Sequence, residues 1–485
     1  MKNVGTLKGH GASDSPVDHK PASQPPKGRT ITPWLVVVLA VILLSGALFG
    51  YDQGVISGAL KSIKAAFSLS ELLVEVVTSW VTLGALFGAL AGGELADRLG
   101  RKHSVLIAGV VFTAGSLVEA LTPGTIVLVI GRLIVGAGVG AAAVAAPLYA
   151  AELAPSALRG RFISAYQLAV AGGIFVAYLV DGWLAKDDAW RWMLGLSAVP
   201  GLMLIGFALL TPQSPRWLMR MQRRADAATE MRKIHPGTDS GPGLDTIASS
   251  LAKEHGRASW GEVFGKKWRR PLLVGVGLAV FQQITGINAI IYYADQIFQA
   301  AGFTTEAAQT TATTWAVGGV NVVATFIAIA FIDRLGRRKL LLAGLVGMAL
   351  SLVVVGAAFE FITRATAGHP VATSTAGIVT LVALVIFIAC FAFSMGPVVW
   401  TVINEIFPGH IRGRAVAVAT AVNWASAFIV SQVFLSLINV IGDSFTFWLF
   451  ASFCALGWIW VFYAVPETKG RSLEQIQQIW QSSGS

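Results

Sequence analysis

Twelve long apolar stretches divide this chain of 485 residues, and they limit its fold more strongly than any other feature. Each is close to the roughly 20 residues that a helix needs to cross a bilayer. With 55% hydrophobic and only 13% charged residues, the chain lies far from the composition of a soluble domain. The sequence therefore predicts an all-α membrane protein with spans near 34–58, 72–95, 104–122, 124–149, 162–184, 189–211, 271–298, 306–332, 339–362, 374–404, 413–437 and 443–465.

One long polar connection, residues 212–270, separates the first six spans from the last six. Its segments "RADAATEMRKI" and "LDTIASSLAKE" have the periodicity of short amphipathic helices. We expect five regions, namely a polar N-terminal tail, a first six-helix bundle, a linker of short helices, a second six-helix bundle and a C-terminal tail. Their expected bounds are 1–33, 34–211, 212–270, 271–465 and 466–485.

The distribution of lysine and arginine predicts how the chain is oriented in the membrane. If the N-terminus is cytoplasmic, 30 of the 36 basic residues fall in the tails and loops on that side. Because basic residues accumulate on the cytoplasmic side, both termini are expected there. Residues 1–33 have no apolar core followed by a cleavage site, so no signal peptide is expected. The net charge of +10 then faces anionic lipid and implies no nucleic-acid partner.

The stretch "LFGYDQGVISG" places the carboxyl group of Asp52 inside the first apolar span. A charged group in hydrocarbon is costly, and by default it marks a functional site. Arg132 lies within the fourth span, nine residues from Pro123, as Asp52 lies nine residues from Lys61. At 1.5 Å per residue both side chains lie roughly 13 Å below the same membrane surface. We expect the two to pair, either as a fixed salt bridge or as a proton-dependent switch.

Amide side chains concentrate in the second half of the chain. Gln282, Gln283 and Asn288 fall within seven residues, although on one straight helix they would point in different directions. Thr285 and Gly286 lie between them and permit a local break in the helix, which would let the amides converge. Amides can exchange several hydrogen bonds with a bound ligand, and aromatic rings can cover an apolar face of it. Candidate rings are Phe391, Trp400, Trp424, Tyr292 and Tyr293, although most aromatic residues in spans only pack.

Several short motifs repeat between the two halves. "GGELADRLGRK" is echoed by "AFIDRLGRRK", and "YAAELAPSALRGR" by "VINEIFPGHIRGR". With "PQSPRWL", "QQITGINAIIYY", "GPVVW" and "PETKGRSLE", they resemble the sugar porter family of the major facilitator superfamily over about residues 45–475. The resemblance implies two six-helix bundles that transport a monosaccharide or polyol by alternating access. It implies no cofactor, and it fits a monomer in the inner or plasma membrane.

The resemblance also assigns roles to individual residues. Proton-coupled members carry an acid where this chain has Asp52, whereas facilitative members have a neutral residue, so Asp52 favours proton symport. The family's sugar-contacting positions correspond here to Gln167, Gln282, Gln283, Asn288, Trp400, Asn321 and Asn423. Ala392 stands where some facilitative members have an acid, a departure that bears on which hydroxyl groups are preferred.

Charged residues in the cytoplasmic loops are expected, again by resemblance, to form an inner gate of salt bridges between the bundles. The residues are Asp97, Arg98, Arg101, Glu152, Arg159, Asp333, Arg334, Arg337, Glu405 and Arg412. The alternative is that these residues only set topology. The usual "PESPRWL" of the family reads "PQSPRWL" here, so Gln213 removes one charge and predicts a weaker closed gate.

Three other functions are alternatives to sugar–proton symport. A membrane enzyme is disfavoured because all seven histidines lie outside the apolar stretches and no HExxH motif, cysteine cluster or phosphate-binding glycine loop occurs. A membrane sugar sensor would need an output segment, and only about 20 residues follow the last span. A facilitative sugar uniporter without proton coupling stays the closest alternative. The sequence does not identify the sugar, because pocket residues of this kind occur in carriers of several sugars and polyols.

Overall fold

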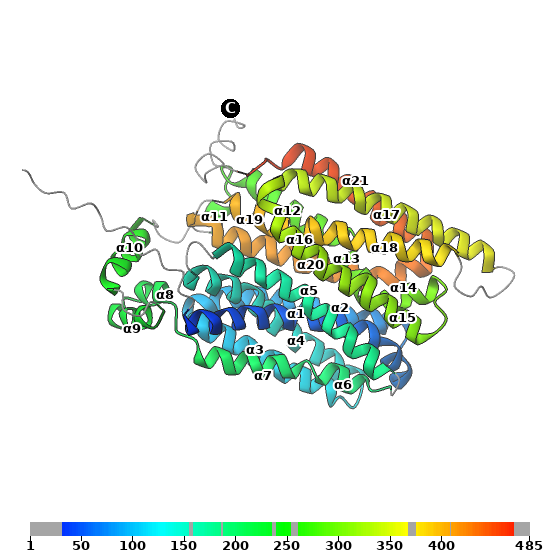
Figure 1. Ribbon diagram of the computed structural model, residues 1–485, viewed down its shortest axis with the longest axis horizontal. Coiled ribbons are helices and arrows are strands. Elements are labelled where there is room, and N and C mark those ends of the chain that lie inside the picture. Colours follow the sequence, from blue (N-terminus) through cyan, green and yellow to red (C-terminus); the bar gives the residue numbers. More distant parts are fainter. Residues whose placement is uncertain are drawn as a thin grey trace, which may run out of the picture.

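The computed structural model describes residues 32–154, 159–185, 188–234, 239–253, 260–366, 375–407 and 409–469. Within them, twelve helices are long and apolar enough to cross a membrane, as the sequence predicts. The tails at 1–31 and 470–485 lie outside the described residues. Figure 1 shows a molecule built of roughly parallel and antiparallel helices, and no strand occurs in the described ranges.

The helices of the first half form one bundle. They are α1 (Pro33–Phe67), α2 (Glu71–Arg98), α3 (Arg101–Ala120), α4 (Thr125–Leu153), α5 (Arg159–Leu184), and the sixth span made of α6 (Trp190–Gly195) and α7 (Ala198–Leu210). Four short helices follow, namely α8 (Pro215–Arg220), α9 (Arg224–Ile234), α10 (Ser240–Lys253) and α11 (Trp260–Val263). The two amphipathic helices predicted in the connection are thus α9 and α10.

The second half repeats the six spans, but three of them are interrupted. The seventh span consists of α12 (Arg269–Ile284), α13 (Ile287–Tyr292) and α14 (Ala294–Ala300). The eighth consists of α15 (Glu306–Ala312), a π-helical segment η2 (Thr313–Gly319) and α16 (Val320–Leu335). The others are α17 (Arg337–Thr366), α18 (Thr375–Phe393) with α19 (Met395–Glu405), α20 (Gly409–Ile441) and α21 (Asp443–Ala464).

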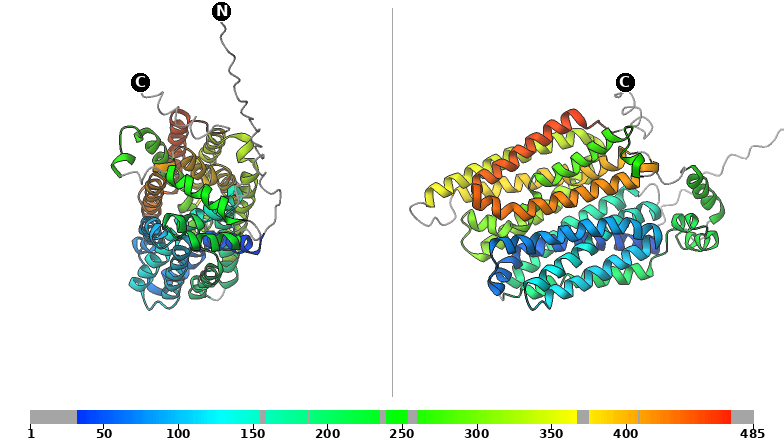
Figure 2. Two further views of the ribbon diagram at one scale, coloured as in Figure 1. Left: turned by 90° about the vertical axis from the view of Figure 1, so that its left-hand side faces the viewer. Right: turned by 180° about the vertical axis from the view of Figure 1, so that it is seen from behind.

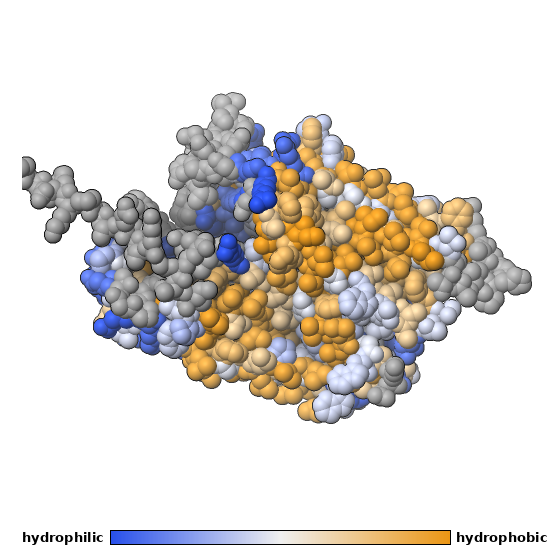
Figure 3. Space-filling model, viewed as in Figure 1, coloured by the Kyte–Doolittle hydropathy of each residue, from blue (hydrophilic) through white to orange (hydrophobic). Residues whose placement is uncertain are grey.

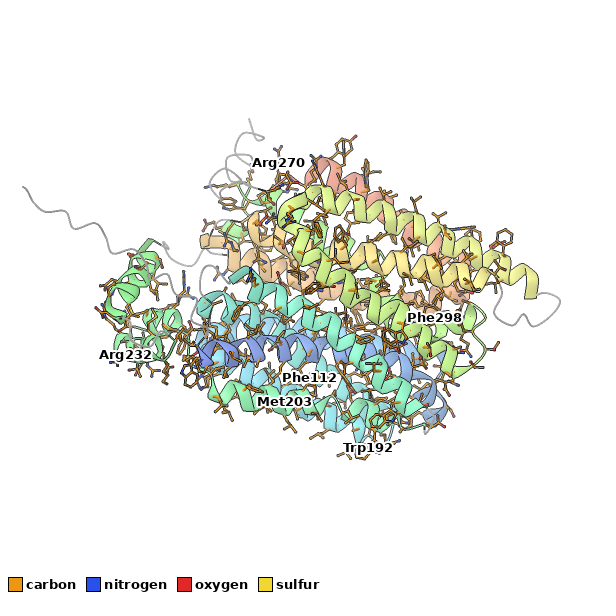
Figure 4. All side chains as sticks on the ribbon, viewed as in Figure 1. Phe112, Trp192, Met203, Arg232, Arg270 and Phe298 are labelled. Carbon is orange, nitrogen blue, oxygen red and sulfur yellow. The ribbon has the colours of Figure 1, made fainter. Side chains whose placement is uncertain are left out.

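The two bundles lie side by side, with the first half below and the second half above in Figure 1, and the views of Figure 2 agree. Helices α8 to α10 project from one end, which we call the linker end; the opposite end is the far end. On the face shown in Figure 3, an apolar belt covers the middle of the molecule, and hydrophilic residues gather at the linker end. In Figure 4, Arg232 lies in the linker, and Trp192 and Phe298 lie towards the far end.

Local sequence signals set the ends of the first helices. Thr32 caps α1, its hydroxyl group accepting a hydrogen bond from Leu35 N, and Pro33 opens the first turn. Ser68 ends α1 in the left-handed conformation at φ 49°, and Ser70 caps α2 in the same manner as Thr32. Helix α1 therefore extends nine residues beyond the span expected to end at residue 58, and Ala59, Leu60 and Ile63 of this extension are buried.

Glycines bring α1 against α5 at very short distance. Gly46, Gly50, Gly54 and Gly58 recur every four residues along one face of α1. A Cβ atom on Gly50 would lie 1.9 Å from Val170 O, and one on Gly54 would lie 2.7 Å from Ala177 Cβ. Only glycine permits this approach, and small-residue stripes of this kind are typical of helices packed inside membranes. The contact fixes the depth and rotation of α1, and hence the position of Asp52.

The hydrogen bonds and ion pairs described between the bundles run from the middle of the molecule to the far end. Near the far end, Glu75 on α2 accepts hydrogen bonds from the backbone nitrogen (2.6 Å) and hydroxyl group (2.7 Å) of Ser436 on α20. Ser79 donates to Gln432 at 2.7 Å, and an exposed ion pair joins Lys61 to Glu306 at 3.1 Å. These contacts hold the bundles together at the far end, which we therefore call the closed end.

Candidate functional site

Asp52 and Arg132 form the ion pair that the sequence predicts from their equal depth in the membrane. Arg132 Nη1 on α4 donates to Asp52 Oδ1 on α1 at 2.6 Å, and Arg132 Nε donates to Val77 O on α2 at 3.1 Å. The two residues are 0% and 3% exposed. One arginine thus ties together three helices of the first bundle. A buried pair of this kind adds little net stability, but losing one partner costs about 3–5 kcal/mol. A change of charge at either residue therefore has a large effect on the stability of this arrangement of helices.

A second carboxyl group reaches the same arginine, and the sequence analysis missed it. Glu119 on α3 is 1% exposed, and its Oε1 lies 3.6 Å from Arg132 Nη1. Gly131 makes room for it, because a Cβ atom there would lie 2.6 Å from Glu119 Cγ. The group is one arginine between two buried acids. Glu119 lies inside the apolar stretch 104–122, so the reasoning that identified Asp52 applied equally to it.

The seventh span breaks where the sequence predicts a break. Helix α12 ends at Ile284, Gly286 adopts φ +91°, and α13 begins at Ile287. A residue with a side chain is strained at this φ, and a Cβ atom on Gly286 would also lie 2.6 Å from the ring of Phe450. The break turns Asn288 back towards Gln283. On a straight helix these two side chains, five residues apart, would point in different directions.

Amide side chains from three helices then form one continuous hydrogen-bonded chain. Asn288 Nδ2 donates to Gln283 Oε1 at 2.9 Å, Gln283 Nε2 donates to Asn423 Oδ1 at 3.2 Å, and Asn423 Nδ2 donates to Gln282 Oε1 at 2.7 Å. Gln282 Nε2 ends the chain at Met395 O, 2.7 Å away on α19. The predicted convergence of Gln282, Gln283 and Asn288 is present in the structure, and Asn423 joins them from α20. They provide several exchangeable donors and acceptors, as a polyhydroxylated ligand requires.

The first bundle joins this chain through a residue that the sequence analysis did not select. Gln53, next to Asp52 on α1, donates through Nε2 to Asn288 Oδ1 at 3.0 Å. Gln53 and Asn288 are each 4% exposed. Two neighbouring residues of α1 thus contact the buried arginine and the amide chain of the opposite bundle.

Gln167 and Phe391 lie beside the other end of the amide chain. A Cβ atom built on Gly396 would lie 3.8 Å from Gln167 Nε2 on α5 and 3.6 Å from Phe391 Cε1 on α18. The carbonyl oxygen of Gly396 also accepts from Gln282 Nε2 at 3.3 Å. Residues of both bundles therefore lie close to Gly396. A side chain at this position would occupy the space between Gln167 and Phe391.

The remaining candidates for sugar contact differ in their surroundings. Trp424 packs edge-to-face on Phe49 of the first bundle, with ring centroids 5.1 Å apart. Tyr292 is fully buried on α13, and Trp400 is half-buried on α19. Tyr293 instead stacks on Phe434 at 5.1 Å and donates to Ser431 O at 3.2 Å, and Asn321 accepts from Thr325 of its own helix at 3.4 Å. These contacts of Tyr293 and Asn321 are packing contacts, and neither joins the amide chain.

The charged loop residues of the first half bond within their own bundle and with the start of the linker. Arg101 Nη2 lies 2.8 Å from Glu152 Oε1, and Glu152 Oε2 accepts from Ser214 Oγ at 2.5 Å. Asp97 Oδ1 is 3.4 Å from Arg101 and 3.3 Å from Arg220, whereas Arg98 pairs with exposed Glu94. Gln213 Oε1 accepts from the backbone nitrogens of Lys102 (3.2 Å) and Ser214 (3.1 Å).

The second half repeats this cluster residue by residue. Arg337 Nη2 lies 3.1 Å from Glu405 Oε1, and Glu405 Oε2 accepts from Thr468 Oγ1 at 2.5 Å. Glu467 Oε2 accepts from Arg338 N at 3.2 Å, as Gln213 accepts from Lys102 N in the first half, and Glu467 Oε1 also accepts from Arg337 N at 3.0 Å. Gly100 and Gly336 precede the two arginines at φ +89° and +91°. The two halves are thus structural repeats, and Gln213 is the uncharged counterpart of Glu467.

The cross-bundle salt bridges expected at the inner gate are not among the pairs described above. Arg412 donates through Nε and Nη2 to Phe407 O of its own bundle, at 3.1 and 3.0 Å, and Arg334 lies over the ring of Phe331 at 5.9 Å. The side chains of Arg159 and Asp333 lie outside what the structure describes. Pairing between the bundles stays a prediction for a conformation closed at the linker end.

Known proteins resemble this chain over most of its length. The family model "Sugar (and other) transporter" matches residues 37–480. The galactose-proton symporter of Escherichia coli K12 is 38% identical over 457 residues, covering 93% of this chain and 96% of its own. The arabinose-proton symporter of Bacillus subtilis is 34% identical, covering 92% and 95%. The glucose transport protein of Synechocystis is 35% identical, covering 94% and 100%.

Solved structures resemble the fold as well. The xylose transporter XylE from E. coli in a partially occluded inward-open conformation matches with a TM-score of 0.78 at 31% identity, covering 90% of this chain and 99% of that one. The proton:xylose symporter XylE bound to 6-bromo-6-deoxy-D-glucose matches with a TM-score of 0.76 at 32% identity, covering 92% and 99%.

Proposed function

Because this chain belongs to the sugar porter family of the major facilitator superfamily, whose members are transporters and not enzymes, we propose that it is a proton-coupled monosaccharide symporter for a glucose-like sugar. One observation carries the proposal. The buried pair of Asp52 with Arg132 lies one residue along α1 from Gln53, which bonds to the amide chain. A proton site and a sugar site thus share one helix. No cofactor is needed, since the proton is itself transported.

The proton is proposed to bind Asp52. When Asp52 is ionised, it holds Arg132 at 2.6 Å and the two charges compensate each other. A proton on Asp52 removes its charge, and Glu119, 3.6 Å from the same Nη1 atom, becomes the acid that retains the arginine. Because Arg132 also bonds to α2, a shift of its side chain alters how α1, α2 and α4 hold together. Protonation therefore changes the relative stability of two arrangements, as coupling requires.

The sugar is proposed to bind along the amide chain between the bundles. Its hydroxyl groups exchange hydrogen bonds with Gln282, Gln283, Asn288 and Asn423, and Gln167 contributes from the first bundle. Phe391, Trp400, Trp424 and Tyr292 supply apolar surface for the ring face of the sugar. Tyr293 and Asn321 act through packing in the conformation described above. Symporters and transporters of galactose, arabinose, xylose and glucose among the relatives support a monosaccharide substrate.

The linker end is proposed to face the cytoplasm. Helices α8 to α11 lie in the basic segment 212–270, and basic residues accumulate on that side of membranes. Both termini are then cytoplasmic, and the closed end faces outward. The protein is proposed to work as a monomer in the inner or plasma membrane, with lipid around its apolar belt (Figure 3).

Transport by purified protein in vesicles tests the proposal. Adding sugar outside should drive sugar uptake together with proton entry, which raises the pH of a weakly buffered medium. Sugar uptake without any change of pH would instead identify a facilitative uniporter. Sugar binding without uptake would identify a sensor. Competition by a panel of unlabelled sugars then determines the substrate.

A further inference from the structure

The group around Arg132 contains three ionisable side chains whose charges do not balance. Arg132 carries one positive charge, whereas Asp52 and Glu119 carry two negative charges when both are ionised. The three residues are 0%, 3% and 1% exposed, so little water reaches them to screen the excess charge. A buried charge without a counter-charge is costly. With both acids ionised, the group is therefore stabilised by taking up one proton.

The distances distinguish the two acids. Asp52 Oδ1 accepts from Arg132 Nη1 at 2.6 Å, whereas Glu119 Oε1 lies 3.6 Å from the same nitrogen atom, too far for a hydrogen bond. Glu119 Oε1 and Arg132 Nη2 are both buried without a hydrogen-bond partner in the described part of the chain. Asp52 is thus the bonded partner of the arginine. Glu119 is a second partner, which a shift of less than about 1 Å would bring to hydrogen-bond distance.

The other charged and titratable groups on the surrounding helices do not supply a buried counter-charge. From α6, Arg191 donates to Thr122 O at 2.9 Å and lies over the ring of Trp190 at 4.1 Å, but its side chain is exposed and its charge is solvated. The remaining groups are two buried acids and two buried tyrosines, namely Glu75 of α2, Asp181 of α5, Tyr51 of α1 and Tyr292 of α13. None of these four carries a positive charge. The charge of Arg132 is therefore shared between Asp52 and Glu119.

We propose that Glu119 is a positioning residue that sets the pH range in which Asp52 takes up the transported proton. Without the charge of Glu119, a proton on Asp52 would leave Arg132 buried as an unbalanced positive charge. With Glu119 ionised, the same proton leaves Arg132 paired with one carboxylate, and the group becomes neutral. Protonation of Asp52 therefore costs less and occurs at higher pH. The inference rests on the proposed function, because it takes Asp52 as the carrier of the proton.

The proton and the arginine exchange places on Asp52. A proton from the medium binds Asp52 Oδ1 and displaces Arg132 Nη1, which then donates to Glu119 Oε1. Arg132 Nε can keep its bond to Val77 O, now 3.1 Å long, so the guanidinium group pivots and stays attached to α2. When Asp52 releases the proton, Arg132 returns to Asp52. Each state thus leaves the arginine with a carboxylate partner.

The pH profile of uptake tests this role. Purified protein in vesicles takes up a labelled sugar, chosen from glucose, galactose, xylose and arabinose by its uptake rate, at a membrane potential fixed by a potassium gradient. Glu119→Gln keeps the shape of the side chain but removes its charge. We expect the external pH of half-maximal uptake to fall by about one to three units, the shift that one nearby charge typically produces. At sufficiently low pH the maximal rate should return.

Two further variants separate charge from structure. Glu119→Asp keeps the charge on a shorter side chain, so the pH of half-maximal uptake should fall less than in Glu119→Gln. Ser116→Ala is the matched control, since its hydroxyl group lies about one turn earlier on α3 and bonds only to Phe112 O, at 2.9 Å, among the described contacts. This control should keep the profile of the unsubstituted protein. Size-exclusion chromatography establishes that each variant is folded.

An unchanged or raised pH of half-maximal uptake in Glu119→Gln would overturn this role, even if the rate falls, because a purely structural residue affects the rate alone. Failure of the proposed function gives a different result. Uptake by the unsubstituted protein that does not vary with pH, or proton-coupled uptake that survives in Asp52→Asn, would remove Asp52 as the carrier and this role of Glu119 with it. Coupling that is lost in Asp52→Asn, together with an unshifted profile in Glu119→Gln, would overturn the role of Glu119 alone.

Discussion

Asp52 and Gln53 are consecutive residues of α1 whose side chains bond to opposite bundles. Asp52 bonds to Arg132 at 2.6 Å within the first bundle, and Gln53 bonds to Asn288 at 3.0 Å in the second. Any movement of α1 that accompanies a change of charge at Asp52 therefore also displaces the donor to Asn288. Coupling of proton and sugar binding can be tested at each of these contacts separately.

Replacing Asp52 by asparagine should abolish concentrative uptake but not sugar binding. Asparagine keeps the shape and a hydrogen bond to Arg132 but fixes the neutral form. A proton moving inward through 100 mV releases about 2.3 kcal/mol, enough for a tens-fold sugar gradient. We expect Asp52→Asn to lose both the gradient and the sugar-induced rise in external pH, while exchange between preloaded vesicles continues. Alkalinisation at the unsubstituted rate would make Asp52 structural.

Removing an amide from the chain should weaken sugar binding. Gln283→Ala or Asn288→Ala leaves neighbouring amides without a partner, at a cost of roughly 1–3 kcal/mol for each unsatisfied group. We therefore expect the dissociation constant to rise about tenfold or more, as measured by calorimetry on purified protein. Thr325→Val, which removes a hydroxyl group bonded only to Asn321 among the described contacts, serves as the control. Unchanged affinity in both alanine variants would move the sugar site away from the seventh span.

Replacing Gln53 by leucine should reduce the effect of pH on sugar affinity. The substitution removes the donor to Asn288 but leaves Asp52 and Arg132 in place. Because coupling between two ligands is reciprocal, a weaker connection should make the sugar dissociation constant vary less with pH. Calorimetry at two pH values measures this. Ser45→Ala on the same helix, where the hydroxyl group bonds only to Val41 O at 2.8 Å, should behave like the unsubstituted protein. Equal pH dependence in Gln53→Leu would exclude this contact as the connection.

Neutralising Arg412 should bias the transporter towards the conformation that is open at the linker end. If Arg412 pairs across the bundles only when that end is closed, Arg412→Gln destabilises the closed state alone. We expect cysteines placed near the linker end to react faster with a membrane-impermeant reagent from that side. Arg223→Gln, which breaks the exposed pair with Asp226, is the control. An unchanged labelling pattern would leave these arginines as determinants of topology only.

Reasoning from the sequence succeeded where the outcome depends on local properties of the chain. Hydropathy predicts the twelve spans, because each must satisfy its own backbone hydrogen bonds within lipid. The equal depth of Asp52 and Arg132 in the membrane predicts that they pair. The glycine at position 286 predicts the helix break that turns Asn288 towards Gln283. The repeated "DRLGR" motif predicts the two matching loops at Gly100 and Gly336.

Only the tertiary structure determined which polar side chains meet across helices. Gln53, Asp181 and Asp295 lie in apolar stretches, but the residues to which they bond lie 235, 123 and 238 positions away in the chain. Glu119 contacts Arg132 of the next helix, a contact that depends on how α3 packs on α4. The sequence suggested salt bridges between the bundles, whereas Arg101 with Glu152 and Arg337 with Glu405 pair inside them in this conformation. The physical reason is that a side-chain bond forms over about 3 Å, so its partner depends on how closely two helices approach. Hydropathy predicts how deep in the membrane a residue lies, and the packing of the helices determines which residue it contacts.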